Sequence, residues 1–168
     1  QLQNIADAST LAAARELGDQ YCQYCSCDAD PPPPGCDIRD HTPDLAAIVA
    51  VAQEVAQNNW ALGKSQVQVL PGDVVLGKFD HTAPKKIDPS GCGPGVGSCD
   101  AVRTIVRMDG SANGPMATVF AKIMGIDSVE IGADATAALS GPSTWEPGEI
   151  DLPIGISEIF LGGDACDE

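Results

Sequence analysis

The spacing of apolar residues in this chain changes near Gly63, and this change limits the folds that the chain can adopt. Before Gly63, apolar residues recur every three or four positions, which is typical of amphipathic helices; after it they alternate with polar residues, as in half-buried strands. The predicted class is α+β, in the order α-α-β-β-β-α-β, with helices covering one face of a small antiparallel sheet. We expect helices over 2–19, 41–63 and 115–125, and strands over 65–70, 74–80, 101–108 and 127–139.

The two long helices carry signals for their ends. The first is rich in alanine, so that a neighbouring element can approach it closely, and Gly18 weakens the end of its pattern. For the second, we expect Thr42 as N-cap, Pro43 at the first helical position, Asp44 in the first turn and Gly63 at the exit.

The alternating segments predict which side chains share a face. The strands over 65–70 and 74–80 are expected to form a hairpin around the turn "PGD". The helix over 115–125 is expected to begin at Ser111 or Asn113 and to end at Gly125. Two strand faces are predicted, the first with Val102, Thr104, Val106 and Met108 and the second with Val129, Ile131, Ala133, Ala135 and Ala137.

The formal charge of −15 excludes a nucleic-acid-binding function, because phosphate backbones require many Lys and Arg and only nine are present. The acidity favours a soluble body in an extracellular setting. Calcium binding by Asp-rich loops stays an alternative, although "DAD" at 28–30 lacks the Gly and the closing Glu of an EF-hand loop.

No catalytic pattern is present in the sequence. No serine lies in a nucleophile elbow, and no H-E-x-x-H motif occurs. His41 and His81 each precede a turn with proline, which favours helix-entry or loop positions over catalysis. We therefore expect a protein that is not an enzyme and binds no cofactor.

Four of the seven cysteines lie in "YCQYCSCDADPPPPGC", residues 21–36. The C-x-x-C-x-C spacing could hold zinc or an iron–sulfur cluster, with His41 as a further ligand. A cysteine-rich, exported chain instead favours disulfides that hold the connector between the two helices. A metal site and a working redox pair stay as alternatives.

Cys92 and Cys99 enclose a Gly-rich loop and are the expected pair, with a stabilisation of about 2–3 kcal/mol at most. The stapled loops are then 21–42 and 81–100. Seven is an odd number, and Cys166, near the end of the sequence, is the natural candidate for the cysteine left over. The connectivity cannot be deduced among the other candidates, which are Cys22, Cys25, Cys27, Cys36 and Cys166.

Two segments resemble a known family. "LQNIADASTLAAARELGD" is similar to the "LQNAADAAALAAA" signature of Tad-domain (TadG-like, TadE–TadG) Flp pilus-assembly proteins. The closing block of that family, a V-x-V strand, an F-x-x-x-x-G helix and an A-x-A-x-A strand, resembles 102–106, 120–125 and 133–137 here. "LPIGIS" at 152–157 is similar to a stretch that follows the domain in longer members. The resemblance covers residues 1–140 and leaves 141–168 as an irregular tail or the start of a further region.

The resemblance implies a non-catalytic, adhesion-related component of an extracellular or envelope pilus or filament. In the family, the first helix continues from a transmembrane segment, so we expect a membrane contact only through an N-terminal helix that this chain lacks or has lost. The implied partners are other filament subunits, including further copies of this chain, and the implied location is extracellular or periplasmic. The dense cysteines depart from the family pattern. The alternative function is an exported metal- or electron-handling accessory protein that uses Cys22, Cys25, Cys27 and Cys36.

Overall fold

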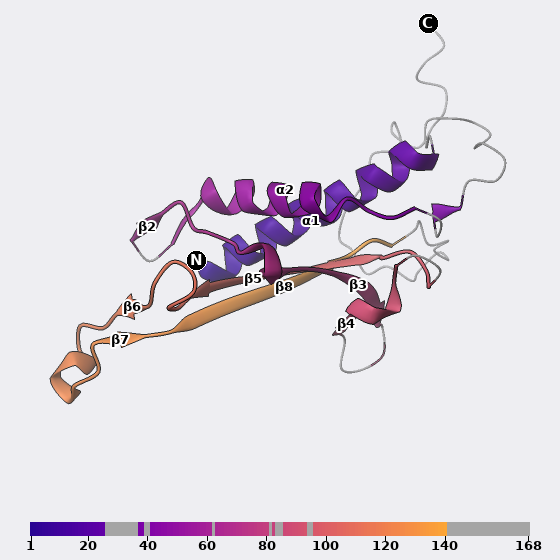
Figure 1. The fold of residues 1–168 in the computed structure, drawn as a ribbon. Coiled ribbons are helices and arrows are strands. Elements are labelled where there is room, and N and C mark those ends of the chain that lie inside the picture. Colours follow the sequence, from indigo (N-terminus) through magenta and orange to yellow (C-terminus); the bar gives the residue numbers. More distant parts are fainter. Residues whose placement is uncertain are drawn as a thin grey trace, which may run out of the picture.

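The computed structural model of the protein describes residues 1–25, 37–38, 41–61, 63–80, 82, 86–93 and 96–140. Two helices lie on one face of a four-stranded antiparallel sheet (Figure 1), which confirms the α+β class. The strand order in this sheet is β4-β3-β5-β8. Strand β5 follows β4 in this list of sheet strands along the chain, but it pairs with β3 instead of β4. The strands are β3 (Val74–Asp80), β4 (Lys86–Asp88), β5 (Ala101–Met108) and β8 (Ile131–Ala138).

Helix α1 (Leu2–Cys25) lies along β5 and β8 and contacts them through small side chains. Its buried face carries Ala6, Ser9, Thr10 and Ala13, which allow the helix axis to approach the sheet closely. The Thr10 hydroxyl donates hydrogen bonds to the carbonyls of Ala6 (2.7 Å) and Ala135 (3.4 Å). The abundance of alanine in the first helix therefore has a packing reason.

The predicted end of the first helix near Gly18 is wrong, since α1 continues to Cys25. A Cβ atom added at Gly18 would lie 3.5 Å from the Leu139 side chain, so this glycine faces the end of β8. Burial against the sheet offsets the cost of about 1 kcal/mol that glycine adds to a helix interior.

Helix α2 (Leu45–Gln57) begins directly after Asp44, which is its N-cap. The prediction of Thr42 as N-cap and of Pro43 as the first helical residue is therefore wrong. The Asp44 carboxylate accepts hydrogen bonds from the backbone N–H groups of Ala46 (2.9 Å) and Ala47 (3.2 Å). A carboxylate satisfies these free N–H groups and complements the positive end of the helix dipole.

The amide of Gln20 fixes the start of α2 against α1. It accepts a hydrogen bond from the Asp44 backbone N–H (2.8 Å) and donates one to the Asp44 carbonyl (3.4 Å). At its other end, α2 stops at Gln57 and not at Gly63, because a small hairpin of β1 (Trp60–Ala61) and β2 (Lys64–Ser65) follows.

The core lies between the helices and the inner face of β5. The predicted face with Val102, Thr104, Val106 and Met108 is buried, as expected for a strand paired on both sides. Leu17 of α1 and Ile48 of α2 are fully buried above it and close the layer.

The predicted hairpin of 65–70 with 74–80 is wrong, because β3 pairs with β4 and β5 instead. Val67 and Val69 are buried, but the segment over 66–70 belongs to no strand ladder. Side chains hold it, together with a backbone hydrogen bond from the Val67 N–H to the Asn59 carbonyl (3.5 Å). The Gln53 amide donates a 2.8 Å hydrogen bond to the Val69 carbonyl. The alternation of apolar residues in this segment therefore indicates which side chains are buried, and it does not indicate a strand.

The predicted helix over 115–125 is also wrong. Strands β6 (Met116–Ala117) and β7 (Ser128–Val129) pair there, with a 3-10 turn at Ala121–Met124 between them. Gly125, with φ of +80°, ends this turn as predicted for the helix. In the part of the chain that the structure describes, nothing buries an apolar face here, since Phe120 and Ile123 are exposed, and an isolated helix this short is unstable.

Asn113, which was expected as a helix N-cap, has a different role. Its backbone is in the left-handed region with φ of +62°. Its side-chain amide donates to the carbonyls of Gln68 and Arg107, each over 2.8 Å, and so ties the 66–70 segment to β5.

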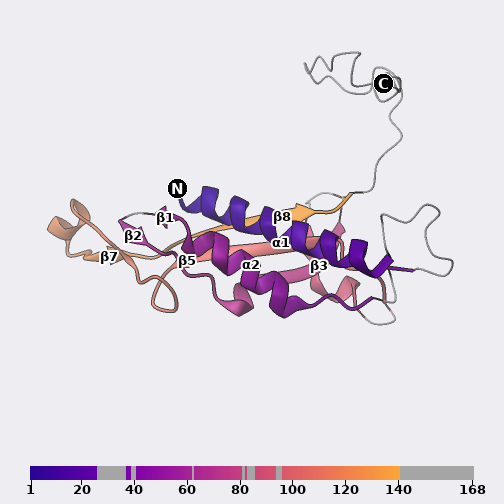
Figure 2. The same cartoon turned by 90° about the horizontal axis from the view of Figure 1, so that it is seen from above.

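We refer to residues 115–130 as the arm. The arm continues the β5–β8 ribbon and projects beyond both helices at one end of the molecule, as Figures 1 and 2 both show. The C-terminal end of α1 lies at the opposite end (Figure 2). The described part of the protein is therefore elongated, with the arm and the end of α1 far apart.

Candidate functional site

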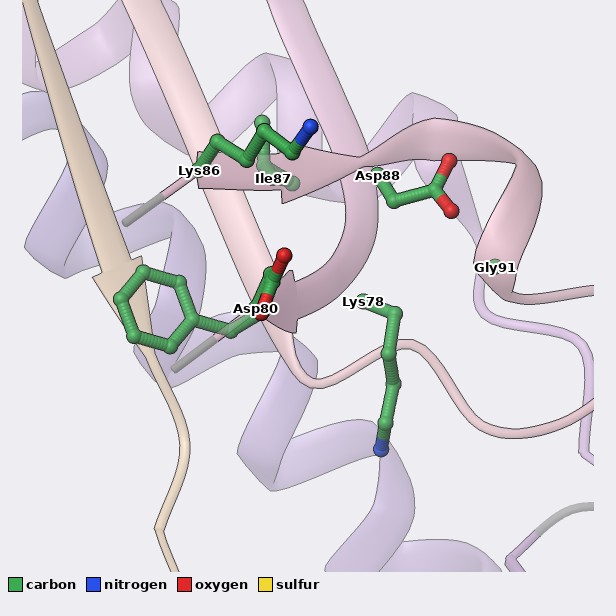
Figure 3. A pocket seen from close by; sticks show the side chains of 7 residues that line it. Lys78, Asp80, Lys86, Ile87, Asp88 and Gly91 are labelled. Carbon is green, nitrogen blue, oxygen red and sulfur yellow. The ribbon is translucent and has the colours of Figure 1, made fainter. Parts of the chain in front are cut away.

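The β3–β4 hairpin borders an open pocket of ≈ 580 Å³ (Figure 3). Lys78 lies opposite Asp88 and Asp80 lies opposite Lys86, so that the four charges on these strands balance. The Lys78 amine forms an ion pair with Asp100 at 2.6 Å. The lining of the pocket therefore carries two lysines and two aspartates, and this gives no net charge with which to attract an ionic substrate.

Asp88 has a structural role in the same pocket. Its carboxylate accepts hydrogen bonds from the Ser90 hydroxyl (2.7 Å) and the Ser90 backbone N–H (2.9 Å). These bonds hold the pKa of Asp88 below its ordinary value of 3.8. The carboxylate caps the short turn at Pro89–Gly91 and stays ionised, which does not suit a general acid.

The expected Cys92–Cys99 disulfide is present, with the two Cα atoms 4.9 Å apart. Cys25 is also disulfide-bonded, whereas Cys22 is a half-buried free thiol and is therefore not one of the disulfide cysteines. Cys27, Cys36 and Cys166 lie outside the described residues.

A metal site on Cys22, Cys25, Cys27 and Cys36 requires four thiolates, and the disulfide at Cys25 removes one of them. Within the ranges that the structure describes, no group of three or more His, Cys, Asp or Glu side chains could hold a metal ion. The proposed calcium ligands at 28–30 and the second histidine, His81, lie outside these ranges.

His41 lies at the entry to α2, as expected, and packs on aromatic residues of α1. Its ring stacks on Tyr24 with the ring centroids 4.7 Å apart and meets Tyr21 edge-on at 5.7 Å. This arrangement fills the space between the two helices, and the contacts described give His41 a packing role.

A second pocket, of ≈ 520 Å³, lies where the last turns of α1 meet the end of β8, and we call it the end pocket. Its lining combines apolar groups from distant parts of the chain with the ion pair of Lys78 and Asp100. No sequence signal marked it, because its residues are brought together only by the fold. The residues used below are Tyr21, Cys22, Ile38, Asp100 and Leu139.

The arm is the most unusual surface of the molecule. Of the twelve large apolar side chains exposed among the described residues, six belong to the arm, although it is a small part of the chain. Soluble monomers rarely gather exposed apolar side chains in this way unless the surface binds something. The six are Val119 (78% exposed), Phe120 (85%), Ile123 (88%), Met124 (76%), Ile126 (48%) and Val129 (40%).

The sequence could have indicated the arm through its charge pattern. No Asp or Glu occurs between Asp109 and Asp127, and Lys122 is the only charged residue in that interval, in a chain with 24 acidic residues. The segment over 115–125 was predicted as a short helix from its end signals, and this prediction did not indicate that its side chains are exposed.

Among the described residues, no helix has the length and apolar character needed to cross a membrane. No protein-family model, curated protein or solved structure matches the chain. The resemblance to Tad-domain proteins therefore stays a prediction from the sequence.

Proposed function

We propose that this protein is a non-catalytic structural subunit of an extracellular or envelope filament of the Tad/Flp pilus type, with a role in adhesion. The arm is the observation that carries this proposal. An exposed apolar hairpin has a large cost in water, which is offset when a partner covers it. A subunit that is buried in an assembly gives such a surface its partner.

The pockets support an assembly role over catalysis. In the β3–β4 pocket, Asp88 caps a turn and Lys78 is paired with Asp100. The end pocket is mostly apolar, and its one tyrosine, Tyr21, donates its hydroxyl to a backbone carbonyl. The polar groups of Asp88, Lys78 and Tyr21 thus bond to other parts of the chain and stabilise the fold.

The disulfides support an oxidising location. Cys92–Cys99 closes a Gly-rich loop, and Cys25 is oxidised as well. Structural disulfides persist mainly in exported proteins. The acidic body, with a net charge of −15, keeps such a protein soluble before it is assembled.

The test is the presence of the chain in surface filaments. The gene is tagged in the source cells, filaments are sheared from the surface, and the fraction is probed for the tag. We expect the chain in this fraction and a loss of filaments on deletion of the gene. A chain that is absent from the fraction, with filaments unaffected by the deletion, would refute the proposal.

A further inference from the structure

We infer that the arm of one copy of this chain inserts into the end pocket of the next copy, in a head-to-tail contact. This inference rests on the proposed function and names the partner of the arm as a second copy. It is argued from the positions, the chemistry and the charges of the two surfaces.

The positions come first. The arm projects from one end of the described part of the molecule, and the last turns of α1 lie at the other end (Figures 1 and 2). Residues of these last turns line the end pocket. A contact between two different surfaces of one chain is heterologous, and copies joined in this way form an open chain unless the rotation closes a ring. An elongated molecule with complementary ends suits a linear assembly.

The chemistry of the two surfaces matches. At the tip of the arm, Phe120 and Ile123 are the two most exposed large apolar side chains of the described residues. The end pocket presents Ile38, which is 41% exposed, and the half-buried Leu139. Its ≈ 520 Å³ is in the range of pockets that hold small apolar groups, so two or three side chains of the arm can enter.

The charges favour the same pairing. Two copies with a net charge of −15 each repel one another, and residues 110–126, which include the tip of the arm, form a stretch without carboxylates through which they can approach. The two carboxylates of the arm, Asp127 and Glu130, follow this stretch. Lys122 is the charged residue of this stretch, and the end pocket is lined by the ion pair of Asp100 with Lys78. Asp100 is already bonded to Lys78 and to the Phe79 N–H, but a carboxylate can accept further bonds.

The contact is expected to be weak between free subunits. The arm offers fewer residues than the 20–30 per side of a standard interface. Screening of the repulsion between acidic bodies should strengthen the contact as salt is raised.

The free thiol of Cys22 lines the end pocket and provides a direct test. In the full chain carrying Ile123→Cys, the new thiol should form a disulfide with Cys22 of the next copy. Oxidised glutathione takes up the two electrons and the two thiol protons and leaves as two molecules of reduced glutathione. Each copy then has one reactive group at each end, so we expect a ladder of dimers, trimers and higher species on a non-reducing gel.

Two controls separate this contact from others. The double variant Ile123→Cys/Cys22→Ser should give no ladder, because the partner thiol is removed. Leu11→Cys places a thiol on an exposed face of α1 (65% exposed), outside the arm, and should give no ladder either. Dimers that persist in the double variant would show that the thiol at position 123 reacts with a thiol other than Cys22 and would overturn the inference.

The absence of a ladder with Ile123→Cys would also overturn it. Binding of the chain to phosphatidylcholine vesicles would then be measured. If the wild type binds and the Phe120→Ser/Ile123→Ser variant does not, the arm is assigned to a lipid surface. A chain found in sheared filaments but giving no ladder would refute the head-to-tail contact and leave the proposed function intact. If the chain is absent from the sheared filaments and also gives no ladder, both the head-to-tail contact and the proposed function are refuted.

Discussion

The hydroxyl of Tyr21 donates a 2.9 Å hydrogen bond to the backbone carbonyl of Cys99, which lies 78 residues later in the chain. Tyr21 is buried in α1, and Cys99 belongs to the disulfide that closes the loop before β5. This one bond joins the first helix to the stapled loop, and both groups border the end pocket.

Replacing Tyr21 by Phe should lower the free energy of unfolding by about 0.5–1.5 kcal/mol, because the Cys99 carbonyl loses its donor while the ring stays. Urea denaturation measures the change. Tyr24→Phe is the matched control on the same helix, where the side chain is 47% exposed, and a smaller change is expected. Equal losses in the two variants would contradict the role given to the Tyr21 bond.

The same tyrosine should make the free energy of unfolding depend on pH in the alkaline range. Burial, with the negative charge of Asp100 in addition, raises the pKa of Tyr21 above its ordinary value of 10.0. The neutral phenol is favoured in the folded state, so its contribution is complete below about pH 10 and is lost as the pH rises through the folded pKa. The stability difference between the wild type and Tyr21→Phe should therefore narrow above about pH 10. A difference that is constant with pH would contradict this.

Removal of the Cys92–Cys99 disulfide by Cys92→Ala/Cys99→Ala should lower the free energy of unfolding by about 2–3 kcal/mol, because the bond closes only a short loop. The double variant is used in place of a reductant, since Cys25 is also disulfide-bonded. Cys22→Ala, at a free and half-buried thiol, is the control and should cost less.

Gly77 in β3 has no room for a side chain. An added Cβ would lie 2.5 Å from the Ile87 side chain and 2.7 Å from the Asp88 carbonyl oxygen. Gly77→Ala should therefore destabilise the fold by about 1–3 kcal/mol, as overpacking does. At Gly72 nothing lies within 4 Å of an added Cβ, and Gly72→Ala should change stability by less than about 0.5 kcal/mol. Thermal melts of the two variants make the comparison.

Arg107 and Arg103 lie on the same face of β5 and form ion pairs of different burial. Arg107 pairs with Asp73, whose side chain is only 6% exposed, whereas Arg103 and its partner Asp134 are 40% and 53% exposed. Arg107→Met should cost about 2–4 kcal/mol because it leaves a buried carboxylate uncompensated. Arg103→Met should cost less than about 1 kcal/mol. Similar losses in the free energy of unfolding for the two variants would show that the burial of Asp73 does not make its ion pair more important than the exposed one.

The sequence predicted the parts of the fold where the pattern and the packing agree. The apolar face of β5 could be predicted because a central strand covered on one side must alternate. The Cys92–Cys99 pair could be predicted because a Gly-rich loop lets two nearby cysteines meet. The two long helices were predicted in type, but their ends were not, since Gly18 packs against Leu139 and Asp44 makes the cap.

The remaining errors have a common physical cause. A periodic run of apolar residues shows which side chains lie together, but not whether another layer covers them. The arm and the 66–70 segment both have such runs; the arm is exposed, and Val67 is buried without a strand ladder. The end pocket joins Tyr21, Asp100 and Leu139, which no local pattern can connect.

The course of α1 has a mechanical consequence. With 24 residues it is about 36 Å long, and it follows β8 from Gln3, bonded to the Asp134 carbonyl, to Gly18 beside Leu139. A pull along the long axis of the molecule would load the contact between helix and sheet in shear. In shear, all turns of the helix share the force at the same time, so the subunit should resist extension far better than a fold whose strands peel apart one by one.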